Sequence, residues 1–291
     1  MRPPRTAAGR AGLAALRAEP AGALVALDYD GTLAPIVADP AEAVLAPGAR
    51  RALAALASRG VRVALVTGRP VDVVLELGGL RDLPGLVVMG QYGLERWTAG
   101  SYQAAPELPA VAAVRAELSA RGLAFEDKGR SLVVHTRSAA DPHASQAALL
   151  PGLRELGRRW GLEVHLGRLV VELRPPGFDK RAAVLAVATP TPAAVLYAGD
   201  DIGDGPGFDA VDELRGRGIA GLTVFADSDE GPEALRLRAD LLVDGPAGVV
   251  ALLAQIASIS RGAARRPAGP QPARNRATDG PPPVPPRGAP R

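Results

Sequence analysis

Cysteine is absent from the 291-residue sequence, and histidine occurs only three times. The lack of cysteine excludes a disulfide scaffold, a cysteine-ligated zinc site and a thiol nucleophile, and it fits a reducing, cytoplasmic location. Three histidines are too few for a histidine-rich metal site, so we interpret His135, His143 and His165 as structural residues. The chemistry of this chain must therefore depend on other side chains.

Long apolar runs and aromatic residues are also scarce. No uncharged apolar run reaches the roughly 18–20 residues that a membrane span requires. Arg10 and Arg17 interrupt the N-terminal region, which therefore lacks the apolar core of a signal peptide. Aromatic residues make up 3% of the chain, and we interpret Trp97 and Trp160 as packing residues rather than as a platform for nucleic-acid bases. The composition predicts a soluble globular protein without membrane association.

Basic charge is concentrated at the two ends of the chain. Residues 261–291 carry seven arginines against one acidic residue, and residues 1–20 carry four against one. Because the whole chain has a net charge of only +3, the residues between these ends are acidic overall. A nucleic-acid-binding protein normally holds its basic patch on the folded domain. We therefore expect no nucleic-acid partner.

Short apolar segments alternate with helix-like segments through most of the chain, which is typical of a parallel sheet covered on both faces. The region 99–176 differs, because long helix-like stretches, one of them broken or kinked at Pro151, lie among isolated strands. We predict an α/β fold, with a doubly wound, Rossmann-like parallel-sheet core and an α+β insertion. The expected parts are a lead-in at 1–20, the core at 21–98 and 177–258, the insertion at 99–176, and a disordered proline-rich tail at 259–291.

Two carboxylates follow the first apolar segment. The sequence LVALDYDGTLAPI (24–36) places Asp28 and Asp30 directly after a predicted strand. Side chains at i and i+2 leave a strand on the same side, and ligand sites of open α/β sheets lie beyond the carboxyl ends of the strands. The pattern suits a carboxylate that attacks phosphorus beside a second one that handles the leaving-group proton. The alternative is a solvated turn after a strand.

Thr67 and Gly68 close a second apolar segment, in VALVTGRP (63–70). A hydroxyl and a backbone N–H beside a glycine can bind phosphate oxygens, although an ordinary strand-to-helix loop has the same appearance. Lys180 is one of only two lysines among 34 basic residues. This bias towards arginine favours a need for a compact ammonium at that position, with chance as the alternative.

Asp200, Asp201 and Asp204 close a third apolar segment, in VLYAGDDIGD (195–204). An acidic cluster at a strand end is typical of a site for a hard cation, and oxygen ligands with open water positions suit Mg²⁺. The alternative is that an aspartate caps the next helix.

In this order, the four motifs resemble those of the haloacid dehalogenase-like phosphohydrolase superfamily. The segments FEDKGRSLVVHTR (125–137), GRLVVELRPPGFDK (167–180) and GQYGLERW (90–97) are similar to trehalose-6-phosphate phosphatases, and the resemblance runs from about residue 22 to residue 255. Three positions depart from it. Gly203 and Gly205 flank Asp204 where the family usually has Thr-Asp-Glu, and Arg181 stands where it usually has glycine.

The resemblance implies Mg²⁺-dependent hydrolysis of trehalose 6-phosphate to trehalose and phosphate, in trehalose biosynthesis, through an aspartyl-phosphate. Asp28 would be the nucleophile and Asp30 the general acid and then the general base. Thr67 and Lys180 would hold the phosphoryl oxygens. The insertion would be a cap that closes over the substrate and reads the sugar.

The resemblance also implies a set of ligands. The Mg²⁺ ligands would be Asp28, the backbone carbonyl of Asp30, and Asp200, with Asp201 and Asp204 on the bound waters. The substrate-binding residues would be Asp28, Tyr29 and Asp30 in the core, and Lys128 and Glu172 in the cap.

Three alternatives remain at this point. The chain is a phosphatase for another sugar phosphate, an inactive phosphatase-like regulatory partner of a trehalose-phosphate synthase, or a binding protein that acts through its basic tail. The intact motif residues argue against the inactive regulatory partner. Deletion of 261–291 would abolish function if the protein acts through its basic tail, and would leave the activity of a phosphatase nearly unchanged. A synthase is also a candidate partner of the active enzyme.

Overall fold

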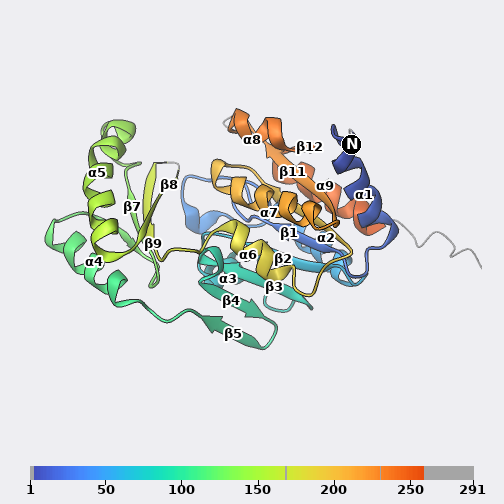
Figure 1. Ribbon diagram of the computed structural model, residues 1–291, viewed down its shortest axis with the longest axis horizontal. Coiled ribbons are helices and arrows are strands. Elements are labelled where there is room, and N and C mark those ends of the chain that lie inside the picture. The colour runs from blue at the N-terminus through green and yellow to red at the C-terminus, as the bar shows by residue number, and fades with distance from the viewer. Residues whose placement is uncertain (1–2, 168, 230, 259–291) are drawn as a thin grey trace, which may run out of the picture. The chain divides into compact units, whose positions relative to one another are not determined.

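An eight-stranded sheet lies at the centre of the core (Figure 1). The computed structural model describes residues 3–167, 169–229 and 231–258, so the predicted tail at 259–291 lies outside the described residues. The strand order is β12-β11-β10-β1-β2-β3-β4-β5, and neighbours from β12 to β3 are parallel. The strands are β1 (Leu24–Leu27), β2 (Arg62–Val66), β3 (Leu86–Gly90), β4 (Glu95–Thr98), β5 (Ser101–Ala104), β10 (Ala194–Gly199), β11 (Ala220–Asp227) and β12 (Leu241–Asp244).

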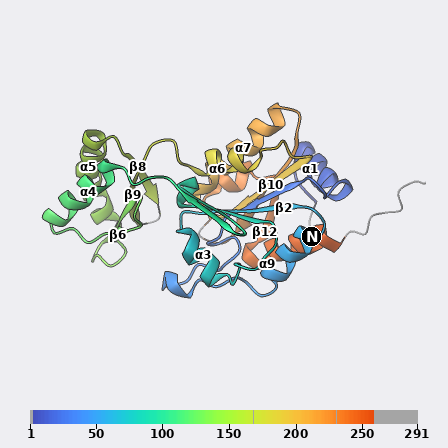
Figure 2. The ribbon, with the colours of Figure 1, turned by 90° about the horizontal axis from the view of Figure 1, so that it is seen from below.

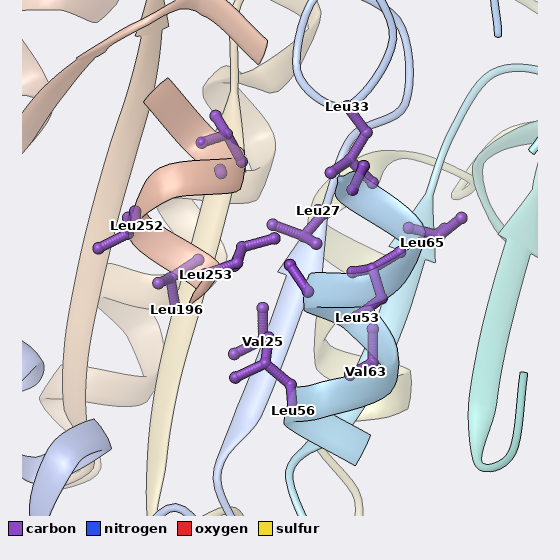
Figure 3. Close-up of a cluster of buried hydrophobic side chains, with 14 of the residues drawn as sticks. Val25, Leu27, Leu33, Leu53, Leu56, Val63, Leu65, Leu196, Leu252 and Leu253 are labelled. Atoms are coloured by element: carbon purple, nitrogen blue, oxygen red, sulfur yellow. The ribbon is translucent and has the colours of Figure 1, made fainter. Parts of the chain in front are cut away.

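Helices cover both faces of this sheet, as predicted (Figure 2). Val25 and Leu27 of β1 pack with Leu53 and Leu253 on one face (Figure 3), whereas Leu24 and Ala26 belong to the buried cluster on the other. Strands buried on both faces are apolar throughout instead of alternating. The first face carries α1 (Ala7–Ala18), α2 (Ala49–Ala57), α3 (Val71–Leu77) and α9 (Gly245–Ser258), and the second carries α6 (Lys180–Val187), α7 (Gly205–Gly216) and α8 (Glu233–Arg238).

β1 lies between β2 and β10, with Leu27 opposite both Leu65 and Ala198. The chain continues from β1 to β2 and β3 on one side, and β10, β11 and β12 lie on the other. This reversal of strand order creates a crevice at the carboxyl ends of the strands. The residues that follow β1, β2 and β10 therefore meet at one edge of the sheet.

The insertion contains a four-stranded antiparallel sheet of order β6-β7-β9-β8. One face packs against two helices, around buried residues that include Val114, Leu156 and Val171. Because side chains alternate along a strand, the other face presents Glu172 and Arg174. The elements are α4 (Pro109–Ala120), β6 (Glu126–Asp127), β7 (Leu132–His135), α5 (Pro142–Trp160), β8 (Glu163–Gly167) and β9 (Val170–Arg174).

Three local features differ from the sequence-based expectations. β4 and β5 form an antiparallel hairpin at the sheet edge, so the core sheet reaches Ala104, whereas we expected the core to end at residue 98. α5 continues through Pro151. α1 packs closely on the sheet, because a Cβ at Gly12 would lie 1.9 Å from the Gly221 carbonyl oxygen. Residues 7–18, within the expected lead-in at 1–20, thus form a helix that belongs to the folded core. Within the described ranges, no helix has the length and apolar character to cross a membrane.

Candidate active site

The predicted catalytic residues come together in a cleft of about 410 Å³ between the core sheet edge and the cap sheet. Its lining includes Asp28, Asp30, Thr67, Lys180 and Asp200 from the core. The cap contributes a further set to the same cleft, namely Lys128, His165, Leu166, Gly167, Val170, Glu172 and Arg174. A wider hollow of about 960 Å³ beside β12 contains none of the predicted site residues.

Lys180 connects two buried carboxylates at the base of the cleft. Its Nζ lies 2.8 Å from Asp28 Oδ1 and 2.7 Å from Asp204 Oδ1. Lys180 is the first residue of α6, and the Asp179 side chain caps this helix by accepting a hydrogen bond from the Ala182 N–H. This capping hydrogen bond at Asp179 sets where α6 begins, and thus which residue projects towards Asp28.

The charges of this cluster do not balance. Burial raises the pKa of Asp28 well above its usual value, against the opposing effect of Lys180. Burial also raises the pKa of Asp200 to about 8, and the charges of Asp204 and Asp201 add to the effect. Burial alone lowers the pKa of Lys180, but the Asp204 and Asp28 carboxylates raise it well above its usual value. One ammonium thus faces several carboxylates, which favours binding of a further cation.

The donor set fits such a cation. Oxygen atoms of Asp28, Asp200 and Asp204 lie within 4.8 Å of one another, and carboxylate oxygens are the ligands that hard divalent cations prefer. Thr32 Oγ1 donates a hydrogen bond to Asp200 Oδ1, at 3.2 Å. Gly31 has a φ of +72°, and a Cβ there would lie 1.9 Å from Asp200 Oδ2. Only glycine at this turn allows Asp200 to approach Asp28 so closely.

Asp204 has a different place from the one expected. Its Oδ1 accepts hydrogen bonds from Lys180 Nζ and from the Tyr197 hydroxyl at 2.6 Å, and its Oδ2 accepts from the backbone N–H groups of Asp200 and Asp201 at 3.0 and 3.1 Å. Asp204 is fully buried. These bonds let Asp204 orient Lys180 and the start of the Asp200–Asp201 loop, and its contact with metal-bound waters stays a prediction. Asp201 caps the short helix η3 (Ile202–Asp204).

Asp30 is held by a residue to which the sequence assigned no role. Arg69 Nε and Nη2 donate to the two Asp30 oxygens, both at 2.7 Å, and Nη1 donates to the Pro40 carbonyl oxygen at 2.8 Å. A two-pronged pair of this kind fixes the orientation of the carboxylate. Arg69 follows Gly68 in VTGRP, so the motif itself contained the signal.

Tyr29 does not contribute its side chain to the cleft. The ring is fully buried, and its hydroxyl donates to the Ala43 carbonyl oxygen at 2.8 Å. A contact of Tyr29 with the substrate would therefore have to come from its backbone, and it stays a prediction. The alternation that places Asp28 and Asp30 on one side of the chain sends Tyr29 to the other. Among the described residues, the backbone N–H groups of Tyr29 and Asp30 have no hydrogen-bond partner.

Lys128 and Glu172 lie in the cleft, as predicted. Lys128 Nζ donates to the Gly68 carbonyl oxygen at 3.1 Å and lies 3.8 Å from Glu172 Oε1. Arg174 projects beside them, with its guanidinium 3.9 Å from the centre of the Tyr92 ring. Arg174 and Tyr92 were not predicted, although Arg174 stands two residues after Glu172 on the same strand face.

His165 also lines the cleft and contacts Arg174, at 3.1 Å between Nδ1 and Nη2. Its pKa is lowered by burial and by the charge of Arg174. The structure therefore places His165 next to the cap residues that face the core, where the sequence suggested only a structural histidine.

Comparison with known proteins identifies the relatives of this chain. Trehalose-phosphate phosphatases of Mycobacterium tuberculosis (strain ATCC 25618 / H37Rv) and Mycobacterium avium (strain 104) are 36% and 34% identical over 205 and 234 residues. These matches cover 64% and 72% of this chain, but only 51% and 56% of the relatives. The chain thus spans about half the length of the curated relatives that it matches.

Solved structures share the fold. The trehalose-6-phosphate phosphatase of Aspergillus fumigatus superposes with a TM-score of 0.64 at 24% identity, covering 89% of this chain and all of that one. A haloacid dehalogenase-like hydrolase from Bacteroides thetaiotaomicron gives 0.60 at 18% identity, over 80% and 96% of the two chains. The C-terminal domain of the Candida albicans trehalose synthase regulatory protein also gives 0.60, at 16% identity over 82% and 94%.

The family profile described as trehalose-phosphatase matches residues 26–237. This range begins in β1, just before Asp28, and contains every predicted site residue. With this match over most of its length, the chain belongs to the trehalose-phosphatase family.

Proposed function

We propose that this protein hydrolyses trehalose 6-phosphate to trehalose and phosphate through an aspartyl-phosphate on Asp28. The observation that carries the proposal is the cluster of Asp28, Lys180 and Asp200 at the carboxyl end of β1, within the family match. Its curated relatives are named trehalose-phosphate phosphatases.

The reaction has two steps. Asp28 attacks phosphorus, the bond between phosphorus and the sugar oxygen breaks, and Asp30 gives that oxygen a proton. Water then attacks the aspartyl-phosphate, Asp30 takes its proton, and phosphate leaves with Asp28 restored. Lys180 and Thr67 would stabilise the charge on the phosphoryl oxygens. The unpartnered N–H groups of Tyr29 and Asp30 support binding of the same oxygens.

Proton transfer by Asp30 requires its pair with Arg69 to open. A protonated carboxyl group accepts the two hydrogen bonds that Arg69 donates less strongly than a carboxylate does, and it must turn its O–H towards the leaving oxygen. The phosphate dianion of the substrate offers Arg69 another partner in the same cleft. Substrate binding would thereby release Asp30 for its role as general acid.

Mg²⁺ would be held by Asp28, the Asp30 backbone carbonyl and Asp200. When bound, it would offset the repulsion between these carboxylates and the phosphate dianion. Lys128 and Glu172 would hydrogen-bond the sugar hydroxyls, since they lie across the cleft from Asp28. A trehalose-phosphate synthase, which would supply the substrate, is the proposed partner.

A panel of substrates tests this function. We expect kcat/KM for trehalose 6-phosphate to exceed that for glucose 6-phosphate by roughly 10²-fold, since two or three lost sugar hydrogen bonds are worth about 1–1.5 kcal/mol each. Phosphate release should be measured for both, for sucrose 6-phosphate and for p-nitrophenyl phosphate, with and without Mg²⁺. A preference for sucrose 6-phosphate would assign another sugar phosphate, and no turnover of any substrate would indicate the inactive regulatory alternative.

Divalent-cation affinity should depend on pH through Asp200. Its pKa of about 8 without a cation means that it is largely protonated below that pH. Mg²⁺ must then displace a proton, so we expect affinity to rise with pH up to about 8 and proton release on binding to shrink above it. Titration calorimetry in buffers of different ionisation enthalpy would measure the release. An Asp200→Asn variant should reduce it, because only the other carboxylate ligand could then release a proton, and equal proton release at pH 6.5 and pH 9 would contradict the assignment.

A further inference from the structure

Gln91 is a buried core residue that contacts the cap in two places. It begins the short helix η2 (Gln91–Gly93) between β3 and β4. Gln91 and the next residue, Tyr92, have φ angles of 46° and 60°, which non-glycine residues rarely adopt. Backbone strain of this kind persists only where surrounding contacts hold it, and it is frequent at functional sites. Both residues contact the cap, Tyr92 through Arg174 and Gln91 through the turn at 128–131.

The Gln91 amide spans the two ends of that turn. Its Nε2 donates to the Lys128 carbonyl oxygen at 2.9 Å, and its Oε1 lies 3.4 Å from Ser131 Oγ. The turn itself is closed by a hydrogen bond from the Lys128 N–H to the Ser131 carbonyl oxygen, at 3.0 Å. One side chain of the core thus holds the whole turn that carries Lys128.

Glu95 fixes the orientation of this amide. Its Oε1 accepts from Gln91 Nε2 at 2.9 Å, and its Oε2 accepts from the Val71 N–H at 2.7 Å. Because Nε2 lies between two acceptors, the Lys128 carbonyl and Glu95, the amide cannot be reversed without loss of both bonds. Arg130 also approaches Glu95 Oε1, at 3.5 Å, and donates to the Ala105 carbonyl oxygen. The hydrogen bond from Gln91 Nε2 to the Lys128 carbonyl oxygen is therefore specific.

The same turn leads to Glu172. Ser131 Oγ donates to Glu172 Oε1 at 2.8 Å, and Lys128 Nζ lies 3.8 Å from that oxygen. Gln91 and Ser131 are fully buried, so water does not replace these bonds when one is lost. A displacement of the turn would move Lys128 and Glu172 together, while Asp28, Lys180 and Asp200 rest on other elements.

We propose that Gln91 is a positioning residue for sugar recognition: it holds the cap turn so that Lys128 and Glu172 meet the sugar, without itself touching the substrate. The inference rests on the proposed function, because it assumes that these two residues bind the sugar hydroxyls. It separates the determinants of sugar affinity, which depend on the Gln91 side chain, from Asp28, Lys180 and Asp200, to which this side chain makes no hydrogen bond.

The test is Gln91→Met, which keeps the length of the side chain and removes both polar atoms. We expect kcat/KM for trehalose 6-phosphate to fall about tenfold or more, mainly through KM, with p-nitrophenyl phosphate turnover within about twofold of wild type. Ser131→Ala, a smaller change at the other end of the contact, should act in the same direction. Gln103→Met is the matched control, since Gln103 is exposed on the edge strand β5. This variant should leave the turnover of both substrates unchanged.

Binding measurements separate this inference from the proposed function. In an Asp28→Asn background, calorimetry should show weaker binding of trehalose 6-phosphate when Gln91→Met or Ser131→Ala is added, and unchanged binding of inorganic phosphate. Equal affinity with and without both substitutions would overturn the positioning role alone. If the folded variants lost activity towards trehalose 6-phosphate and p-nitrophenyl phosphate to the same degree, the positioning role would also be overturned, because such a result would indicate a general structural role. If wild type shows no preference for trehalose 6-phosphate over glucose 6-phosphate, the proposed function fails instead.

Discussion

Replacement of Asp28 by asparagine is expected to lower kcat for phosphate release by roughly 10⁴-fold or more, because an amide cannot attack phosphorus. The fold should survive, since Lys180 keeps its contact with Asp204 at 2.7 Å. The raised pKa of Asp28 means that its charged form is unfavourable in the folded protein. A neutral side chain should therefore leave the thermal midpoint without Mg²⁺ equal or higher at pH 7 and above. Single-turnover phosphate release and thermal unfolding would measure the two effects.

Asp82→Asn is the matched control for this substitution. Asp82 lies on the surface with a side chain 74% exposed and pairs with Arg50, and exposed pairs contribute little to stability. Its loss should alter neither activity nor unfolding measurably. If Asp28→Asn retained activity within tenfold of wild type, with Mg²⁺ still required, the nucleophile assignment would be wrong.

Lys180→Met should affect activity and stability together. The ammonium is buried between Asp28 and Asp204, and removal of one partner from a buried ion pair typically costs about 3–5 kcal/mol, because the remaining charges lose their compensation. We expect the free energy of unfolding to fall by a similar amount. Phosphate release should fall by about 10³-fold or more, since the buried ammonium would no longer stabilise the charge on the phosphoryl oxygens. Denaturant unfolding and initial rates would measure both.

A second substitution separates the two effects. Adding Asp204→Asn to Lys180→Met removes one uncompensated charge, so part of the lost stability should return while activity stays low. Arg181→Met is the control, because Arg181 is the exposed neighbour on the same helix and pairs with Glu213 on the surface. Stability of Lys180→Met close to that of wild type would show that the carboxylates protonate at little cost, contrary to our account of the cluster.

Strand alternation in the sequence predicts some of the residues that meet at the cap, but not all of them. Period-two alternation along β9 places Glu172 and Arg174 on one face, and the sequence around Glu172 indicated that it faces the cleft. Gln91 and Tyr92 could not be found in this way. Their roles depend on a strained loop of the core meeting a turn of the cap 37 residues later. No local periodicity encodes a contact of that kind.

The hairpin β4–β5 was missed for a related reason. Three residues of β5 are exposed, and the strand has no alternating apolar pattern. β5 joins the sheet by pairing with β4, and β4 in turn pairs with β3. The alternation that aligns Asp28 with Asp30 also sends the residue between them, Tyr29, in the opposite direction.

The sequence by itself determined the apolar strands, the polar residues that end them, and a family whose chemistry those residues fit. Such features are local, because burial on both faces of a parallel sheet demands apolar runs and each run must end in residues that tolerate solvent or ligand. Only the tertiary structure decided that β10, β1 and β2 are neighbours, that Asp204 orients Lys180 instead of facing the cleft, and that Arg69 holds Asp30. These outcomes depend on strand order and on competition among buried charges for few partners, and both arise from contacts between segments far apart in the chain.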